Sequence, residues 1–293
     1  MLSNTQQFTL INENTGNLAL QIIPFDEHTF PNVQRPKFYS ILWLKKGEPT
    51  LKTNCAEFAI RQESILFFAP NQPFLLNSDR AIAGEFIHFH SEFFCIYKHD
   101  KETNCNGLLF NNIFSPPFIF VENAENSHEF SRLVKQLKME MAASDCSQHD
   151  MLVAHLKIFL IHAARLKIKQ EKEFELAHTD NDYPHILQCL KELIEVHFRQ
   201  KHAPNEYAEL LNITTKTLGK IAKNYFQKTI SELITERVII EAQRELHLTD
   251  KTVKQIGAEV GFEDEYHFSR YFKNATGVSP SQFRDKVSIF QFA

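Results

Sequence analysis

The stretch from Ile256 to Arg284 constrains the fold of this chain more than any other. Ile256 and Val260 are four residues apart, so they share one face of a short helix. Phe268 and Phe272 repeat that spacing and give a second helix its buried stripe. This spacing predicts a helix-turn-helix, a motif whose second helix enters the major groove of DNA.

The turn and the ends of the second helix carry residues suited to those positions. Gly261 stands at the turn, where the backbone needs a residue that tolerates positive φ. Asp264 can cap the second helix through its side-chain oxygen. Gly277 is expected to end this helix, and Pro280 is expected to prevent its restart.

A weaker copy of the pattern lies upstream, between Tyr207 and Leu233. A repeated helical unit is a stronger signal than a single motif match. Between the copies, Ile230–Leu246 indicates one helix, which at 1.5 Å per residue spans about 25 Å. Since successive major-groove faces are ~34 Å apart, this helix could hold two recognition helices against one side of a duplex. The matched positions are Ala208 with Gly257, Leu211 with Val260, Ile213 with Phe262, Leu218 with Phe268 and Gln227 with Gly277.

At these residues the chain resembles the AraC/XylS family of bacterial transcription regulators. The resemblance runs from about Ile186 to Lys286, and its most specific part is Ile256–Arg284, in which glycines, aromatic residues and cations fall at family positions. The departures are Gly219 inside the first recognition helix, Gln227 for the usual glycine and Gly257 for a common alanine. They bear on the rigidity of the first recognition helix.

The resemblance implies that both recognition helices contact DNA, with bases read by the first turns and phosphates held by the flanks. Arg270 can pair with guanine O6 and N7, and Glu265 could accept from a cytosine amino group. Lys223 and Lys273 are expected at phosphates, unless each lysine is only a solvated charge. Tyr266 could instead pack on its own helix. The residues carried over are Thr215, Lys216, Thr217, Gly219, Lys220 and Lys223 in the first helix and Glu265, Tyr266, Ser269, Arg270 and Lys273 in the second.

The net charge of −4 gives no global basic signature of DNA binding. From Tyr183 to Ala293 there are 15 Lys and Arg against 14 Asp and Glu, so the placement of charge is more informative than its sum. Lysines line one side of the first recognition helix, whereas Glu263–Glu265 crowd the start of the second. We therefore expect the first helix to bind DNA more tightly than the second.

Residues 1 to about 120 have the pattern of short strands separated by turns, such as Phe38–Leu44 before the turn signal KKGEP. Such strands indicate a small barrel or sandwich, and the family resemblance implies a cupin-like β-barrel. The sequence has 27 phenylalanines, many of them in this half, which indicates an aromatic-filled core or pocket. The expected fold class is α+β: an N-terminal cupin-like β-barrel with a helical dimerisation segment, and a C-terminal all-α domain with two helix-turn-helix units joined by a linker helix.

A cupin-like barrel could be a metal-dependent enzyme, which would need inward-facing histidines on neighbouring strands. Phe38–Phe68 contains no histidine, and the only His-x-His pattern in these strands falls on the last of them. The spacing of the histidines and cysteines in and after this last strand does not match a common zinc pattern. We therefore interpret them as core residues with a surface histidine, and we expect no metal and no cofactor. The zinc-type ligands considered as metal candidates are His88, His90, Cys95, His99 and Cys105.

Two amphipathic helices are predicted after the strands, over Glu129–Met141 and Asp150–Lys169. Their apolar stripes could pack on the strands, form a dimer interface as the resemblance implies, or do both. The stripes are Phe130, Leu133, Leu137 and Met141 in the first helix and Leu152, Leu156, Phe159, Ala163 and Leu166 in the second.

The polar stretch Lys167–Asp182 indicates a helix end followed by an exposed linker. The expected domains are therefore residues 1–120, a sensor barrel; 121–176, a helical dimerisation segment; 177–182, a linker; and 183–293, the DNA-binding domain. The five cysteines are odd in number and scattered, which implies no disulfide framework. The chain begins without a signal-peptide pattern, and no run approaches the roughly eighteen apolar residues of a membrane span, so we expect a cytoplasmic protein.

The sequence thus predicts a transcription regulator that binds promoter DNA and is not an enzyme. Its N-terminal domain is expected to sense a small-molecule effector, to form a homodimer, or both. An activator that also contacts RNA polymerase is one expectation, although the residues do not separate activation from repression. The alternatives are a cupin-like metal-dependent enzyme fused to a DNA-binding module, and a regulator whose barrel is only an assembly scaffold.

Overall fold

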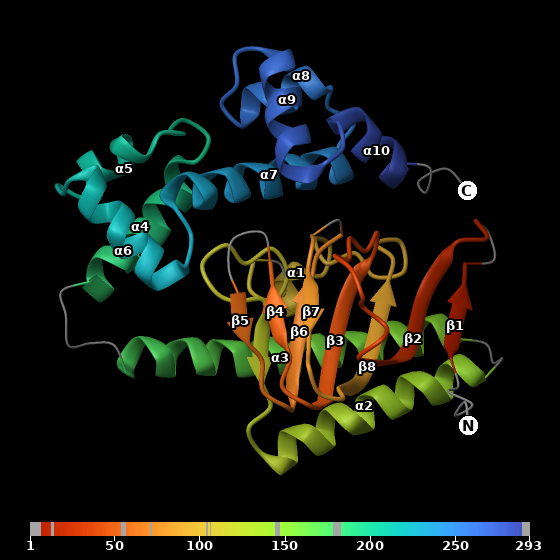
Figure 1. The fold of residues 1–293 in the computed structure, drawn as a ribbon. Helices are drawn as coiled ribbons and strands as arrows, with labels where there is room; N and C mark the ends of the chain where they lie inside the picture. Colours follow the sequence, from red (N-terminus) through yellow and green to blue (C-terminus); the bar gives the residue numbers. More distant parts are fainter. Residues whose placement is uncertain are drawn as a thin grey trace. The chain divides into compact units, whose positions relative to one another are not determined.

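The computed structural model describes residues 7–12, 15–53, 57–70, 72–103, 105, 107–143, 147–177 and 183–288. The chain divides into two compact units, each described below by itself (Figure 1). The first comprises Met1–Asn112 with Pro116–Glu171, and the second comprises Ile113–Ser115 with Lys172–Ala293. Of the predicted linker, 178–182 lie outside the described residues. No described helix is both long enough and apolar enough to cross a membrane.

The first unit contains two antiparallel sheets (Figure 1). The larger consists, in spatial order, of β1 (Phe8–Ile11), β2 (Leu18–Asp26), β8 (Ala83–Phe89), β3 (Tyr39–Lys46), β6 (Ser64–Phe68) and β9 (Phe118–Phe120). The smaller consists of β5 (Glu57–Ala59), β4 (Thr50–Lys52) and β7 (Leu75–Asn77). Since β1 and β9 are opposite edges of the larger sheet, this sheet is open.

The expected closed barrel is therefore wrong, and the turn after β3 shows why. Gly47, at φ +94°, leads the chain out of the larger sheet into β4, which pairs with β5 and β7 instead. Ile41 and Trp43 of β3 pack into one core with helical residues, whereas Leu42 and Leu44 pack into a second core with the smaller sheet. The larger sheet is thus a middle layer with both faces buried.

Helices α2 (Ala124–Ala142) and α3 (Gln148–Ala177) cover the other face of the larger sheet, and α1 (Asp100–Thr103) is a single turn. The apolar stripes predicted for α2 and α3 lie mostly in that core; for example, Leu137 and Leu156 are fully buried. The stripes are therefore used for packing on the sheet. Large apolar side chains left exposed on these helices are Met139, Met151 and Ile158.

Side chains of α3 satisfy the open backbone edge of β9. The Gln170 amide accepts from the Phe120 N–H at 3.1 Å and donates to the Phe120 carbonyl. Lys167 donates to the carbonyls of Pro116 and Phe118 at 2.7 and 3.1 Å, and its burial lowers its pKa to about 8. An edge strand otherwise exposes unpaired backbone N–H and C=O groups. These contacts give such groups partners and also fix α3 on the sheet.

The second unit is helical and has one main core around the central helix α7, which packs against five of the others. Its elements are α4 (Tyr183–His197), α5 (Pro204–Leu210), α6 (Thr215–Phe226), α7 (Ile230–Leu248), α8 (Val253–Glu259), α9 (Glu265–Thr276) and α10 (Pro280–Ser288). The predicted linker helix is α7.

Pro280 does not prevent a further helix but begins α10. Proline suits the first helical position because the amide it lacks would have no partner there. Ser279 Oγ accepts from the Gln282 N–H at 3.2 Å, and the Gln282 side chain accepts from the Ser279 N–H at 3.1 Å. This reciprocal capping box overrides the expected stop.

Candidate DNA-binding surface

The second helix-turn-helix consists of α8, a tight turn and α9. Gly261 in the turn has φ +93°, and a Cβ there would lie 2.2 Å from the Arg199 carbonyl oxygen. Glycine is therefore required both by backbone conformation and by space. Asp264 caps α9 by accepting from the His267 N–H at 2.7 Å. Phe268 of α9 is fully buried, as its spacing predicted.

The first helix-turn-helix, α5 and α6, reaches the same geometry with other residues. Thr214 caps α6 by accepting from the Thr217 N–H at 3.1 Å. Asn212 in the turn has φ +53° and Gln227 after α6 has φ +58°. These are left-handed conformations, which cost a residue with a side chain roughly 1–2 kcal/mol. Gly219 does not distort α6, and a Cβ at this position would have nothing within 4 Å.

The predicted DNA-reading residues lie on the faces of α6 and α9 opposite their buried stripes. Only Gly219 and Ser269 among them are partly buried, and the others are exposed. Tyr266 is 85% exposed, so the alternative that it packs on its own helix is wrong. In the part of the chain that the structure describes, no ion pair involves Lys216, Lys220, Lys223, Arg270 or Lys273.

The two recognition helices correspond position by position, since each has 12 residues and follows a capping residue. Lys220 of α6 corresponds to Arg270 of α9, and Lys223 corresponds to Lys273. The exposed residues Glu263–Glu265 place negative charge only at the start of α9. The structure thus presents two similar surfaces, of which the first is the more positive.

Sequence reasoning missed three kinds of residue in this domain. The left-handed Asn212 gave a weak signal, since asparagine tolerates this conformation better than most residues. Thr214 could have been found as a threonine directly before a helix. The hydrogen bond of 2.9 Å from the Tyr271 hydroxyl to Thr235, which ties α9 to α7, joins residues far apart in sequence and gave no signal.

The histidines and cysteines considered as metal ligands have separate partners. His88 Nδ1 lies 3.0 Å from Ser40 Oγ, and burial lowers the pKa of His88 to about 4. His99 Nδ1 lies 3.0 Å from a Glu102 carboxylate oxygen, and the His90 ring packs against an aromatic ring. Within the described ranges, no group of three or more His, Cys, Asp or Glu is arranged to hold a metal. The remaining candidates, Cys95 and Cys105, are buried and form no disulfide, and Cys105 Sγ accepts a hydrogen bond from the Thr103 hydroxyl at 3.0 Å.

Comparison with known proteins finds a family model that matches part of the second unit. Residues 207–286 match the family model described as a helix-turn-helix domain. The arabinose operon regulatory protein of Escherichia coli is 46% identical over 46 residues, which cover 16% of each chain. That of Salmonella typhimurium is 23% identical and covers 86% of each chain.

A third relative, the Msm operon regulatory protein of Streptococcus mutans, is 25% identical, with 62% of this chain and 66% of that protein covered. The chain spans less than two thirds of the length of several such relatives. The matched domain, the capped helices and the two exposed recognition faces agree with the resemblance seen in the sequence. The chain therefore contains a helix-turn-helix domain over residues 207–286 and is similar, through this domain, to regulators of the AraC/XylS family.

Proposed function

We propose that this protein is a sequence-specific transcription regulator in which α6 and α9 both bind promoter DNA. The observation that carries the proposal is the pair of equivalent helices, each with a buried stripe and an exposed polar face. A recognition helix needs this division, because one face must hold the helix in place while the other reaches the major groove.

The exposed residues suggest distinct roles in that complex. Arg270 has the geometry to donate two parallel hydrogen bonds to a guanine, and Glu265 can accept from a cytosine amino group. Lys223 and Lys273 lie further along their helices and would contact phosphates, which contribute affinity without reading sequence. Because no described acid pairs with these cations, their charge is available to DNA.

The first unit, in this proposal, senses a small-molecule effector. The support comes from relatives that match most of this chain and are named as operon regulators, such as the arabinose operon regulatory protein of Salmonella typhimurium. A carbohydrate is therefore the first class of effector to test. An effector changes DNA binding only if its affinity differs between two states of the protein. Cytoplasmic location and contact with RNA polymerase belong to the same proposal.

A homodimer formed through α3 would use the exposed face of this helix, since its predicted stripe is buried. Met151 and Ile158 are seven residues apart on α3 and are 46% and 40% exposed. Replacing both with lysine should convert a dimer to a monomer in sedimentation velocity while leaving the fold intact. A dimer that persists in this variant would rule out this face.

The test of DNA binding is selection of bound duplexes from a random library by the purified full chain. The selection is run with and without a set of carbohydrates. The proposal predicts an enriched motif with two separate parts, and a change in its enrichment with at least one sugar. The double variant Lys220→Ala/Arg270→Ala, altered only at exposed positions, should enrich no motif. Failure of the wild-type chain to enrich any motif would refute the proposal.

A further inference from the structure

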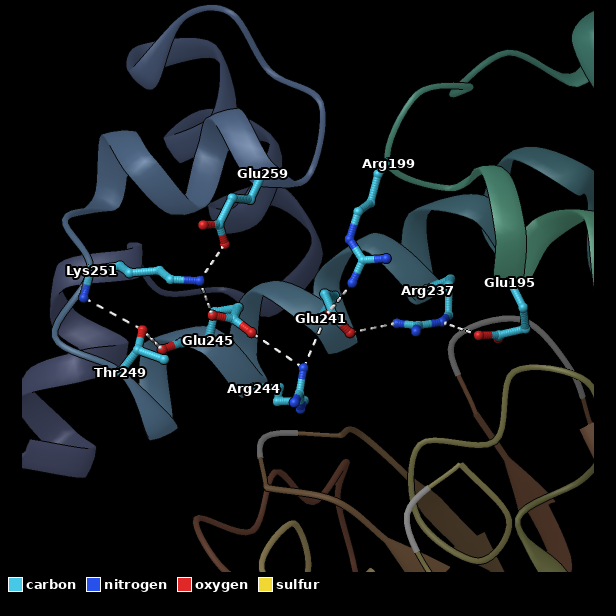
Figure 2. Close-up of polar contacts among 9 residues, drawn as sticks. All are labelled: Glu195, Arg199, Arg237, Glu241, Arg244, Glu245, Thr249, Lys251 and Glu259. Carbon is cyan, nitrogen blue, oxygen red and sulfur yellow. Dashed lines mark hydrogen bonds and ion pairs between the residues drawn. The ribbon is translucent and has the colours of Figure 1, made fainter.

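The helix α7 carries a chain of ion pairs that reaches α4, the segment between α4 and α5, and α8 of the second helix-turn-helix (Figure 2). At its centre is Glu241, whose side chain is only 7% exposed. Its carboxylate accepts hydrogen bonds from Arg199 at 2.7 Å, Arg244 at 3.1 Å and Arg237 at 3.2 Å. Arg237 also pairs with Glu195 of α4 at 2.8 Å. Glu241 is therefore a buried carboxylate shared by three arginines.

The surroundings of Glu241 keep it charged and hold its partners in place. Burial raises the pKa of its carboxyl group, but the three guanidinium groups outweigh this effect, and the net result is a lowered pKa. The guanidinium groups of Arg237 and Arg199 lie 4.0 and 4.5 Å from the centre of the Phe198 ring. Stacking on an aromatic face restricts the orientation of a guanidinium group. Removing one member of such a buried set leaves other charges without a partner.

Arg199 connects this cluster to the turn of the second helix-turn-helix. It lies in the segment between α4 and α5, ahead of the first helix-turn-helix, and its carbonyl oxygen fills the space beside Gly261. In the same segment, the centre of the His202 ring lies 5.0 Å from the centre of the Phe262 ring in the second helix-turn-helix. The segment that leads into the first helix-turn-helix thus packs directly on the turn of the second helix-turn-helix.

At its other end the chain of ion pairs reaches α8. Lys251 pairs with Glu245 of α7 at 2.8 Å and with Glu259 of α8 at 2.7 Å, as Figure 2 shows. Arg244 lies 3.2 Å from the same Glu245 carboxylate and so joins the Lys251 ion pairs to the Glu241 cluster. Lys251 is 38% exposed, and pairs in contact with solvent stabilise a structure only weakly. The buried Glu241 cluster is therefore the stronger part of the chain of ion pairs, and it fixes on α7 the segment that leads into the first helix-turn-helix and packs on the turn of the second.

We propose that Glu241 and Arg199 are positioning residues that fix the spacing between α6 and α9 on DNA. The inference rests on the proposed function, because it concerns how two DNA-reading helices act together. When two linked surfaces bind one ligand, the second contact gains from the first only if the geometry allows both at once. A loosened cluster would leave each helix able to bind its own part of the site but would weaken binding of the whole.

The test compares DNA binding by the wild-type chain with binding by Glu241→Gln and Arg199→Gln. The probes are a duplex selected by the wild type, versions with either half scrambled, and versions with one or two base pairs inserted between the halves. We expect both variants to bind the complete duplex roughly tenfold more weakly. Affinity for each half-scrambled duplex should stay within about twofold, and the penalty for inserted base pairs should shrink.

Two control variants separate positioning from a general loss of folding. Glu236→Gln breaks a different ion pair of α7, to Lys228 at 2.6 Å, and should leave the penalty for inserted base pairs unchanged. Arg199→Lys keeps the charge and should restore part of the discrimination. Arg199 has a half-exposed side chain, so its variants test the proposal even if circular dichroism shows that Glu241→Gln does not fold.

Two results would overturn the inference. One is an equal loss of affinity for complete and half-scrambled duplexes by folded variants, which would indicate a general effect on the domain. The other is an unchanged penalty for inserted base pairs. A wild-type chain that selects no duplex at all would instead refute the proposed function, so the two failures are distinguishable.

Discussion

The two helix-turn-helix units have the same backbone plan but meet its demands with different residues. The second has glycine at both left-handed positions, Gly261 in the turn and Gly277 after the recognition helix. The first has Asn212 and Gln227 at the equivalent positions, with φ of +53° and +58°. The positive φ angles belong to the motif, and the residues that adopt them vary in how readily they do so.

The charges of the two units differ in the opposite sense. The recognition helix of the first unit exposes Lys216, Lys220 and Lys223, whereas the second begins beside the exposed Glu263–Glu265. The unit with the less favourable backbone is therefore the one whose surface suits a polyanion better. The comparison teaches that local stability and DNA affinity are set by separate residues and can be changed independently.

The largest difference should appear when a β-branched residue replaces each turn residue. Gly261→Val should lower the free energy of unfolding by about 4 kcal/mol or more, because the side chain would collide with the Arg199 carbonyl oxygen. The matched change Asn212→Val should cost only about 1–2 kcal/mol, since that position already holds a side chain. Urea denaturation followed by circular dichroism measures both. Equal losses would show that the two turns do not differ in packing.

The next effect concerns the reading of bases by the second helix-turn-helix. Arg270→Ala should cost about 1–3 kcal/mol at the selected duplex and relax the preference at one base pair. The residue is exposed and has no described ion pair, so the fold should not change. Fluorescence anisotropy with a set of single-base-pair variants measures the effect. Unchanged affinity and preference would remove Arg270 from the DNA interface.

A smaller effect is expected at the two matched lysines, Lys223 and Lys273. Replacing either with alanine should weaken binding to all sequences alike and reduce the slope of log affinity against log salt by about one. Binding titrations at several salt concentrations measure this slope. If Lys273→Ala had no effect while Lys223→Ala did, Lys273 would not contact a phosphate and the two recognition helices would differ in how they lie on DNA.

The smallest effects should come from exchanging the residues that follow the recognition helices. Gln227→Gly should raise the free energy of unfolding by about 1 kcal/mol, because glycine adopts positive φ without steric cost. Gly277→Gln should lower it by a similar amount. Gly219→Ala should also raise it, by roughly 0.5–1 kcal/mol, since α6 has room for a methyl group. Thermal unfolding of the three variants checks these signs.

Features that depend on residues close together in the sequence could be predicted, whereas features that depend on contacts between distant residues could not. The recognition helices could be predicted because their stripes and caps, such as Phe268 and Asp264, are local patterns. The open sheet could not, since it depends on which distant strands pair with β4. The Glu241 cluster could not be predicted either, because Arg199 and Glu241 are 42 positions apart.

Capping residues form an intermediate case. The sequence predicts that Pro280 blocks a further helix, because proline disrupts helix interiors, yet Pro280 begins α10. The local signal for this helix start is the pair Ser279 and Gln282, which cap each other. The same kind of local reading would have found Thr214 at the start of α6.

The central claim, that α6 and α9 read separate parts of one DNA site, is tested most directly by repeating the duplex selection with two single variants. Lys220→Ala and Arg270→Ala change corresponding positions of the two helices. We predict that each relaxes a different part of the selected motif, the two parts lying about one helical turn of DNA apart. Relaxation of the same base pairs by both variants, or of none by either, would contradict the account.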